Sequence, residues 1–452
     1  FTYSQTYKYI KFYEANLSTK NFKSIVYINK NHIDHVILYL LCSKNNITFA
    51  SLDLDTNPGD LTKQIELMDN PIVICNQNFF NKLNLKKKDY LNIIKLKKKK
   101  FIKRKIKYFE NNKDFLISFT SGSTGNPKPI SLSQKTKIIR AKSNIEIFGL
   151  GQKGKSLIST PLHHTLAIRI LTISILQGYE IYLMTNYHFE NLLQIIKENF
   201  ITFTIFVSTQ INQLLKKKNN FKFLGSLGSL ISSSSILSIN NKKILLKYFD
   251  RSIYEMYGLS ELSVVTNFDI SKNKSRLASV GKPINGTKIK IQKTKKKKIG
   301  EILVKSKYVF SGYYKNKYET KKSFKEKYFL TGDLGYIKNN FLYLTGRKKR
   351  MMKIKGISVY PEDIEKAFLN SNLIMECVAI SYKDKDEEEK IIFIFTSDKK
   401  NKNLEYMIKK QFLLRLTPFQ IPKRIVRLKL IPKNNMGKIN YQKLKKFLEI
   451  NE

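Results

Sequence analysis

The stretch at residues 115–132, FLISFTSGSTGNPKPISL, organises the rest of the chain. Two apolar runs typical of strands, 115–119 and 130–132, flank a loop rich in Thr, Ser and Gly that carries Lys128. Glycines let backbone N–H groups close around an anion, hydroxyls add donors and lysine adds charge, so the loop predicts phosphate binding. Prolines beside Lys128 disfavour the helix of a Walker A loop, so a second strand should follow, with Ser133 capping the next helix. A flexible polar surface loop is the alternative.

The charge balance is unusual for a chain of this size. Of 452 residues, 83 are Lys or Arg and 35 are Asp or Glu, which leaves a formal net charge of +48. A nucleic-acid or anionic-membrane partner would explain the excess. The lysines are spread along the whole chain, however, beside many Asn and Ile and no Trp, as drift under an A/T-rich genome produces. We therefore predict no specific nucleic-acid partner and only weak, salt-sensitive binding of polyanions.

The cysteines and the hydropathy pattern indicate a cytoplasmic protein. Cys42, Cys75 and Cys377 lie far apart, without the spacing of a disulfide framework or a zinc site, which favours a reducing compartment. No apolar run has the length of a transmembrane segment.

The order of apolar patterns predicts the domain organisation. Strand and helix patterns alternate through the first part of the chain, which indicates a βαβ half with a parallel sheet. The lysine-rich segment 85–107 is expected to be an exposed connection, with a membrane-surface or RNA patch as the alternative. From residue 279 short strands with Gly turns suggest a small barrel or distorted sheet, and a small α+β unit follows the basic stretch 348–355. Strands are expected at 24–28, 48–54, 71–75, 201–207, 227–235, 377–382 and 390–395, and helices at 32–42, 166–176 and 404–416.

Two further segments carry candidate site residues. His163 and His164 end an apolar strand, and ligands of open α/β sheets bind outside the carboxyl ends of strands. A metal site and a simple packed turn are the alternatives, although no third metal ligand is suitably spaced. Segment 251–261, RSIYEMYGLSE, is predicted to be a strand that runs into a Tyr-Gly turn, a hydroxyl and a carboxylate. Beside a bound polyphosphate, Glu261 would suit Mg²⁺; alone it would be a solvated turn residue.

Taken in order, these segments resemble the motifs of the adenylate-forming superfamily, which contains acyl-CoA synthetases, adenylation domains and luciferases. The loop at 120–128 resembles its phosphate loop, and Tyr257-Gly-Leu-Ser-Glu261 resembles its Y-G-x-[ST]-E motif. An ordered set that covers nearly the whole chain is far more specific than any one motif. The later matching segments are Thr331-Gly-Asp333, Gly346-Arg347, 355–365 and Asn435-Met-Gly-Lys438.

The resemblance implies an α/β fold in two parts. Residues 1–347 would form a large AMP-binding adenylation domain of two βαβ-type sheets plus a small β-barrel. Residues 348–452 would form a smaller, mobile α+β lid domain. The hinge maps to Lys349, and Lys353, Lys355 and Gly356 would face the thiol channel after rotation. Arg350 departs from the family, since many relatives carry an acid after the hinge, and this puts the hinge's charge contacts in doubt.

The resemblance also implies roles for individual residues. Tyr257 and the serine edge 232–235 would flank adenine, whereas Asp333 and Arg347 would take the ribose hydroxyls. Lys438 would bridge the substrate carboxylate and the α-phosphate, which Ser260 would touch, and Glu261 would hold Mg²⁺. The ATP phosphates would be held by Thr120, Ser121, Gly122, Ser123, Thr124, Gly125 and Lys128.

The expected function is that of an ATP-dependent acyl-CoA synthetase, with ATP, Mg²⁺ and CoA as cofactors. His164 stands where amino-acid-activating relatives carry Asp, so a plain carboxylic acid is favoured, and 346–365 looks most like the fatty acyl-CoA ligase version. Loading of a carrier-protein phosphopantetheine is one alternative, and a non-catalytic basic binding protein is another. The ending Met436-Gly-Lys438 is also similar to that of short dicarboxylate ligases, so the chain length of the acid stays open, as does the oligomeric state.

Overall fold

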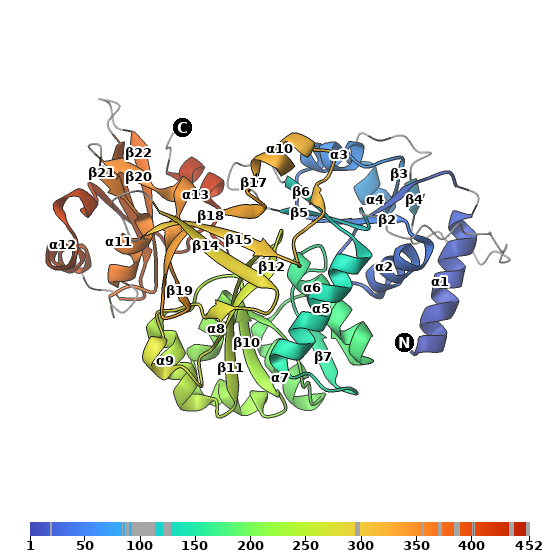
Figure 1. The fold of residues 1–452 in the computed structure, drawn as a ribbon, viewed down its shortest axis with the longest axis horizontal. Coiled ribbons are helices and arrows are strands. Elements are labelled where there is room, and N and C mark those ends of the chain that lie inside the picture. Colours follow the sequence, from blue (N-terminus) through green and yellow to red (C-terminus); the bar gives the residue numbers. More distant parts are fainter. Residues whose placement is uncertain are drawn as a thin grey trace.

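A computed structural model gives the fold (Figure 1). It describes residues 1–18, 20–83, 85, 90–92, 114–120, 128–293, 299–354, 357–368, 373–383, 389–399, 401, 403–433 and 438–448. In Figure 1 the N-terminal elements lie at one end of the molecule and the C-terminal elements at the other, with the sheet of the middle segment below and between them. None of the helices in these ranges has both the length and the apolar character needed to cross a membrane.

The first sheet has seven strands in the order β16-β6-β5-β2-β1-β3-β4. The pairings among β5, β2, β1, β3 and β4 are parallel, as the alternating pattern predicted, and helices on the sheet explain why a strand such as SIVYI is apolar without alternation. The strands are β1 (Ser24–Ile28), β2 (Thr48–Leu52), β3 (Pro71–Cys75), β4 (Tyr90–Asn92), β5 (Leu116–Thr120), β6 (Lys128–Leu132) and β16 (Gly312–Tyr313), and the helices are α1 (Tyr3–Leu17), α2 (Ile33–Asn45), α3 (Pro58–Glu66) and α4 (Gln77–Phe80).

The hairpin that frames the phosphate loop is present as predicted. Strands β5 and β6 pair antiparallel, with Thr120 opposite Lys128. Ser133 then caps α5 (Gln134–Phe148) by accepting a hydrogen bond from the backbone N–H of Thr136 at 3.1 Å. Proline-flanked Lys128 therefore starts a strand, and the loop residues 121–127 lie outside the described residues.

The second sheet has five strands in the order β13-β12-β11-β10-β9. Helices α5 and α6 lie between the two sheets in Figure 1, and one buried apolar cluster contains residues of both sheets and both helices. The strands are β9 (Phe206–Val207), β10 (Ser229–Ser233), β11 (Ser252–Leu259), β12 (Ser263–Asp269) and β13 (Lys282–Pro283), with a separate pair β7 (Lys155–Ile158) and β8 (Glu180–Leu183). The helices are α6 (Thr165–Gln177), α7 (Phe189–Glu198), α8 (Ser208–Leu215) and α9 (Ile239–Tyr248), and the 3₁₀ turns are η3 (Lys218–Leu224) and η4 (Lys274–Arg276).

A third, antiparallel sheet has the order β14-β15-β18-β17, with β19 paired to β18. It is the β unit that the Gly-punctuated strands predicted. The β18–β19 hairpin turns at Asn339 and Asn340, whose φ angles of 50° and 62° suit the right-handed twist of the strands. The elements are β14 (Thr287–Lys293), β15 (Gly300–Ser306), α10 (Lys317–Lys322), β17 (Phe324–Lys325), β18 (Tyr328–Lys338) and β19 (Phe341–Arg347).

The C-terminal elements pack around two apolar clusters of their own, each formed by residues beyond 351. This packing agrees with a separate lid, although the boundary between 347 and 348 remains a prediction. The elements are η5 (Lys348–Arg350), β20 (Met352–Ile354), β21 (Ile357–Val359), α11 (Pro361–Phe368), β22 (Glu376–Lys383), β23 (Glu389–Thr396), α12 (Leu404–Arg415), η6 (Pro418–Gln420), β24 (Arg424–Arg427) and α13 (Tyr441–Phe447).

Two expectations about segments need correction. Within 85–107, expected to be an exposed connection, Tyr90–Asn92 forms strand β4 on β3, and the ring of Tyr90 stacks on Phe80 with centroids 4.0 Å apart. Although Tyr90 follows a run of lysines in the sequence, its aromatic ring provides apolar surface that is buried at the edge of the sheet. In 201–207 only Phe206 and Val207 form a strand, because Phe203 bridges to Ser156 of β7 instead.

Candidate active site

A buried carboxylate joins β11 to β18 and β19. Asp333 accepts a hydrogen bond on Oδ2 from the Tyr257 hydroxyl at 2.8 Å and one on Oδ1 from Arg347 Nε at 2.8 Å. Arg347 lies directly opposite Asp333 in the β18–β19 register. Burial, and then the charge of Asp333, raises the pKa of the Tyr257 hydroxyl. Each carboxylate oxygen keeps a second lone pair, so Asp333 can still accept hydrogen bonds from a ligand's hydroxyls.

The strand that carries Tyr257 does not turn where the sequence predicted. Strand β11 continues through Tyr257 and Gly258 to Leu259, with a bulge at that point in its pairing with β12. A Cβ on Gly258 would lie 1.9 Å from the Ser263 carbonyl oxygen, so only glycine allows this close approach. The bulge moves the turn two residues later and places Ser260 and Glu261 on it.

Arg140 of α5 stabilises this turn through hydrogen bonds. The sequence did not predict this role. Its Nε donates to the Tyr308 carbonyl at 2.8 Å, and its two terminal nitrogens donate to the carbonyls of Ser260 at 3.0 Å and Glu261 at 2.7 Å. Burial, and then the charge of Arg169, lowers the pKa of Arg140 to about 9, while Glu261 opposes the shift. In the sequence Arg140 is one cation among several on a helix, so no local signal distinguishes it.

The carboxylate of Glu261 is linked to Lys128 through one tyrosine. The Tyr313 hydroxyl donates to Glu261 Oε1 at 3.1 Å, and Lys128 Nζ lies 5.2 Å from the centroid of the same ring. Lys128 also pairs with Glu319 of α10 at 2.5 Å. Within the described ranges no group of three His, Cys, Asp or Glu could hold a metal unaided, so an ion at Glu261 would need further ligands such as phosphate oxygens.

Lys438, near the end of the sequence, lies close to the same carboxylates. Although much of its surface stays exposed, loss of water around its amine lowers its pKa, and Arg347 adds to this shift. Asp333 and Glu261 act in the opposite direction and raise it. Lys438, which precedes α13, therefore lies within electrostatic range of the carboxylates of Asp333 on β18 and Glu261 on the turn after β11. This brings residues separated by more than a hundred positions into one electrostatic environment.

The two histidines lie beside this centre rather than at a strand end. They follow β7 by several residues, and His164 is the N-cap position of α6. His163 Nε2 lies 3.1 Å from His164 Nε2 and 3.6 Å from Asp53 Oδ2. Burial, then His163 and Lys438, lowers the pKa of His164 well below its usual value, so its imidazole is neutral at neutral pH.

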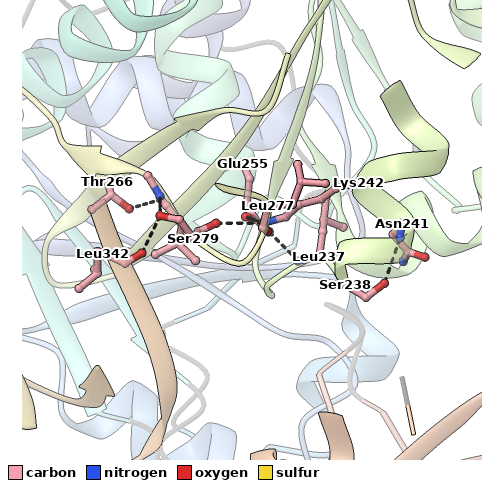
Figure 2. A network of polar contacts seen from close by, with 11 residues as sticks. Leu237, Ser238, Asn241, Lys242, Glu255, Thr266, Leu277, Ser279 and Leu342 are labelled. Atoms are coloured by element: carbon pink, nitrogen blue, oxygen red, sulfur yellow. Dashed lines mark hydrogen bonds and ion pairs between the residues drawn. The ribbon is translucent and has the colours of Figure 1, made fainter. Parts of the chain in front are cut away.

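A buried network of polar contacts joins α9, β11 and the segment after β10, as Figure 2 shows. Glu255 Oε2 lies 2.6 Å from Lys242 Nζ, and Glu255 Oε1 accepts from the backbone N–H of Leu237 at 2.5 Å. Lys242 also donates to the carbonyls of Leu277 at 2.8 Å and Ser279 at 3.0 Å. Because Glu255 is two residues before Tyr257 on β11, this network ties the segment after the serines to the strand that carries the tyrosine.

The linker between β19 and β20 is held from both sides. Lys348 Nζ lies 2.9 Å from Glu301 Oε2 on β15, whereas Arg350 pairs with Glu362 at 2.8 Å and Glu365 at 2.6 Å on α11. Burial works against the charge of Arg350, but Glu365 and Glu362 raise its pKa overall. Arg350 therefore has two acidic partners on α11, which are its charge contacts in this arrangement.

The structure leaves part of the predicted site undescribed. The hydrogen bonds, ion pairs, ring contact and electrostatic effects described above bring together Tyr257, Ser260, Glu261, Asp333, Arg347, Lys438, His164 and Lys128. Lys349 lies in η5 and Lys353 in β20. The residues Ser121, Gly122, Ser123, Thr124, Gly125, Lys355 and Gly356, and the side chain of Thr120, lie outside the described part of the chain.

Comparison with known proteins gives a consistent result. The family model described as AMP-binding enzyme matches residues 1–314. A 2-succinylbenzoate–CoA ligase of Bacillus licheniformis is 28% identical over 73% of this chain and 69% of its own length. A putative long chain fatty acid–CoA ligase VraA of Staphylococcus haemolyticus is 28% identical over 72% of this chain and 68% of its own.

The fold is shared with solved structures at low sequence identity. The o-succinylbenzoate CoA synthetase MenE of Bacillus subtilis, in complex with its acyl-adenylate intermediate, has a TM-score of 0.85 and 20% identity over 98% of this chain and 93% of its own. ATP-bound MatB of Rhodopseudomonas palustris also has a TM-score of 0.85, at 19% identity over 99% of this chain and 93% of its own.

Proposed function

Since this chain belongs to the AMP-binding enzyme family, we propose that it is an ATP-dependent acid–thiol ligase that activates a carboxylic acid as an acyl-adenylate and passes the acyl group to coenzyme A. Its curated relatives are named CoA ligases, which favours an enzyme over a non-catalytic basic binding protein. ATP, Mg²⁺ and CoA are the cofactors of this proposal.

The observation that carries the proposal is that Lys438 lies close enough to Arg347, Asp333 and Glu261 for their charges to act on its pKa. Adenylation brings two anions together: a carboxylate oxygen bonds to the α-phosphorus as the bond from that phosphorus to pyrophosphate breaks. A lysine placed between them stabilises the charge that develops on the phosphate oxygens. His164, which is neutral, can stand beside the carboxylate without adding a competing charge.

The remaining residues would bind and orient ATP. Asp333 would accept hydrogen bonds from the ribose hydroxyls with Arg347 beside it, and Tyr257 would present its ring to adenine opposite the serine edge 232–235. Ser260 would contact the α-phosphate. Mg²⁺, held by Glu261 and phosphate oxygens, would neutralise charge on the leaving pyrophosphate. The phosphates themselves would be held by Thr120, Ser121, Gly122, Ser123, Thr124, Gly125 and Lys128.

The second half-reaction would follow a rotation of residues 348–452 about Lys349. The thiol sulfur then bonds to the acyl carbon while the bond from that carbon to the AMP oxygen breaks, and the thiol proton passes to solvent. Lys353, Lys355 and Gly356 would border the thiol path. A carrier-protein phosphopantetheine remains the alternative acceptor, since the basic chain would attract an acidic carrier.

The identity of the acid is the finer part of the proposal. The segment 346–365 favours a fatty acid, as in the relatives named for long-chain fatty acids, while other relatives are named for 2-succinylbenzoate. The linear acid carries one carboxylate and the aromatic acid carries two, so charge distinguishes these substrate classes.

Pyrophosphate exchange and thioester formation test the two half-reactions separately. We expect exchange with at least one acid, dependence on Mg²⁺, and thioester formation with CoA in preference to a carrier protein. Lys438→Ala should reduce exchange by about 10²–10³ but spare thioester formation from added acyl-AMP. The matched control is Lys446→Ala, an exposed lysine of α13. The absence of exchange with every acid, or equal losses in both variants, would refute the proposed function.

A further inference from the structure

A small cavity lies between α5 and α6, behind the turn that carries Ser260. Its volume is about 10 Å³, close to the roughly 10–15 Å³ that one buried water needs, so it holds one water or one monatomic ion and no larger group. Apart from one alanine, every residue of its wall is a cation or carries a hydroxyl, and none is an acid. The cations are Lys137, Arg140 and Arg169, and the hydroxyl residues include Thr165, Thr172 and Ser263.

Two of the three cations have no acidic partner in the described part of the chain. Arg140 is occupied by the three carbonyls described above. Lys137 is 5% exposed, and the contact of Arg169 is a long one, from a terminal nitrogen to Met256 Sδ at 3.9 Å. The charges found to act on Lys137 are those of Arg140 and Arg169, which are both positive. Because a buried charge without a partner destabilises a fold, an anion in the cavity would remove an unfavourable contribution.

The hydroxyl of Ser263 is a second, independent indication of a ligand. Ser263 is the first residue of β12 and only 3% exposed, and its Oγ is buried with no hydrogen-bond partner among the described residues. Buried hydroxyls in folded proteins are almost always hydrogen-bonded, because an unsatisfied donor loses its contact with water and gains nothing in return. Since Ser263 belongs to the wall of the cavity, a group bound there would supply the missing acceptor.

The chemistry of the wall favours an anion over a water molecule. A buried water must donate hydrogen bonds as well as accept them, whereas the side chains of Lys137 and Arg169 only donate. The hydroxyl of Thr172 already donates to a carbonyl of its own helix at 2.7 Å, and the hydroxyls of Thr165 and Ser260 lie 3.4 Å from each other. The cavity therefore offers many donors and few free acceptors, which suits an ion that accepts on every side.

We propose that the cavity is a binding site for one monatomic anion, chloride, held by Lys137, Arg169 and the hydroxyl of Ser263. Burial and the two neighbouring arginines lower the pKa of Lys137, and the ion would act in the opposite direction and keep its amine protonated. The contact between Thr165 and Ser260 separates the cavity from the reaction centre, so the site is distinct from that of the substrate. The bound ion would stabilise the packing of α5 and α6 against the Ser260 turn, whichever acid is activated.

The test measures thermal unfolding of the purified chain, without acid or ATP, while potassium chloride replaces potassium gluconate at constant ionic strength. We expect Tm to rise with chloride along a saturating curve, by about 2–5 °C at a hundred times Kd, because only the folded chain holds the ion. Bromide should act in the same way, whereas sulfate is too large to enter. Lys137→Met and Arg169→Met should each remove most of the shift, and Arg169→Lys should retain part of it. The matched control, Lys135→Met, alters an exposed lysine of α5 and should leave the shift unchanged.

Crystals grown in bromide give a readout that does not depend on the stability of any variant. Wild type should show an anomalous difference peak between Lys137 and Arg169. A water molecule there, or an equal Tm in chloride and gluconate, would overturn the inference. A chloride shift that persists in both methionine variants would assign the effect to another site and would also overturn it. None of these measurements involves pyrophosphate exchange, so the inference and the proposed function succeed or fail separately.

Discussion

At the scale of single residues, Asp333 connects the ring of Tyr257 with the guanidinium of Arg347. Asp333→Ala should weaken ATP binding, because it removes charge-assisted contacts to ribose and also frees both neighbours to move. Contacts of this kind are worth about 1.5–3 kcal/mol, so KM for ATP should rise or the exchange rate should fall by tenfold or more. Steady-state exchange at varied ATP measures this directly.

Tyr257→Phe is the matched variant for that prediction. It keeps the ring expected to lie against adenine and removes only the hydroxyl that donates to Asp333. We expect KM for ATP to rise, or the exchange rate to fall, by about threefold, because a ligand group or water replaces one neutral donor. Unchanged kinetics in Asp333→Ala would show that the ribose is bound elsewhere.

His35 should make stability depend on pH. It lies edge-on to the rings of Tyr27 and Phe49, and burial, with a smaller effect of His163, lowers its pKa from 6.5 to about 3. Below pH 6.5, His35 therefore binds a proton in the unfolded chain but not in the folded chain. As a result, the free energy of unfolding decreases as pH falls from 6.5 towards 3. The loss attributable to this group approaches about 1.4 kcal/mol per pH unit.

The measurement is the free energy of unfolding in denaturant at several pH values for wild type and His35→Phe. The variant removes the titration and retains an aromatic ring among aromatics, so its profile should be flatter between pH 6.5 and 4. Parallel profiles for the two proteins would mean that the ring of His35 becomes protonated in the folded state.

At the scale of elements, the linker after β19 leaves one residue between two anchors. Lys348 is tied to Glu301 and Arg350 to Glu362 and Glu365, so a rotation of the C-terminal elements must change the backbone of Lys349. Lys349→Pro fixes φ there. We expect thioester formation to fall by about tenfold or more while exchange stays near wild type, because in the proposed mechanism only the second half-reaction needs the rotated arrangement.

Lys349→Ala is the control, since it removes the same side chain and leaves the backbone free. Single-turnover assays of both half-reactions should then resemble wild type. Equal losses of exchange and thioester formation in the proline variant would argue against a pivot at this position.

At the scale of the whole molecule, the net charge of +48 should govern loose association and not the reaction. Raising salt from low to physiological concentration screens exposed charges beyond roughly 8–10 Å. We expect nucleic acid bound to the purified protein to be released, while turnover with saturating substrates changes by less than about twofold. Gel filtration with absorbance ratios, run beside the turnover assay, measures both effects.

A complex with one nucleic-acid sequence that survives high salt would contradict this expectation. Such binding would require base-specific contacts, which do not weaken with salt in the way that phosphate contacts do. This outcome would support a specific polyanion partner, which the even spread of lysines along the sequence disfavours.

Local sequence preferences were sufficient to predict the strands and the helix cap on either side of the phosphate loop. Glycines and prolines around Lys128 predicted a loop between two strands, and Ser133 predicted the cap of α5, because these preferences act within a few residues. The alternation of apolar runs predicted the parallel pairings of β1, β2 and β3 for a similar reason. The order of short motifs was likewise enough to indicate the family, since each motif needs only its own neighbours.

The tertiary structure alone decided which charges are buried and what they face. Arg140, Lys137 and Lys242 look like ordinary surface cations in the sequence, yet each has a relative exposure of 5% or less. The partners of Arg140 and Lys242, such as the carbonyls of Glu261 and Leu277, lie far away in the chain. The cost of burying a charge depends on those distant groups, so the hydrogen bonds from Arg140 to the Ser260–Glu261 turn could not be predicted from local pattern.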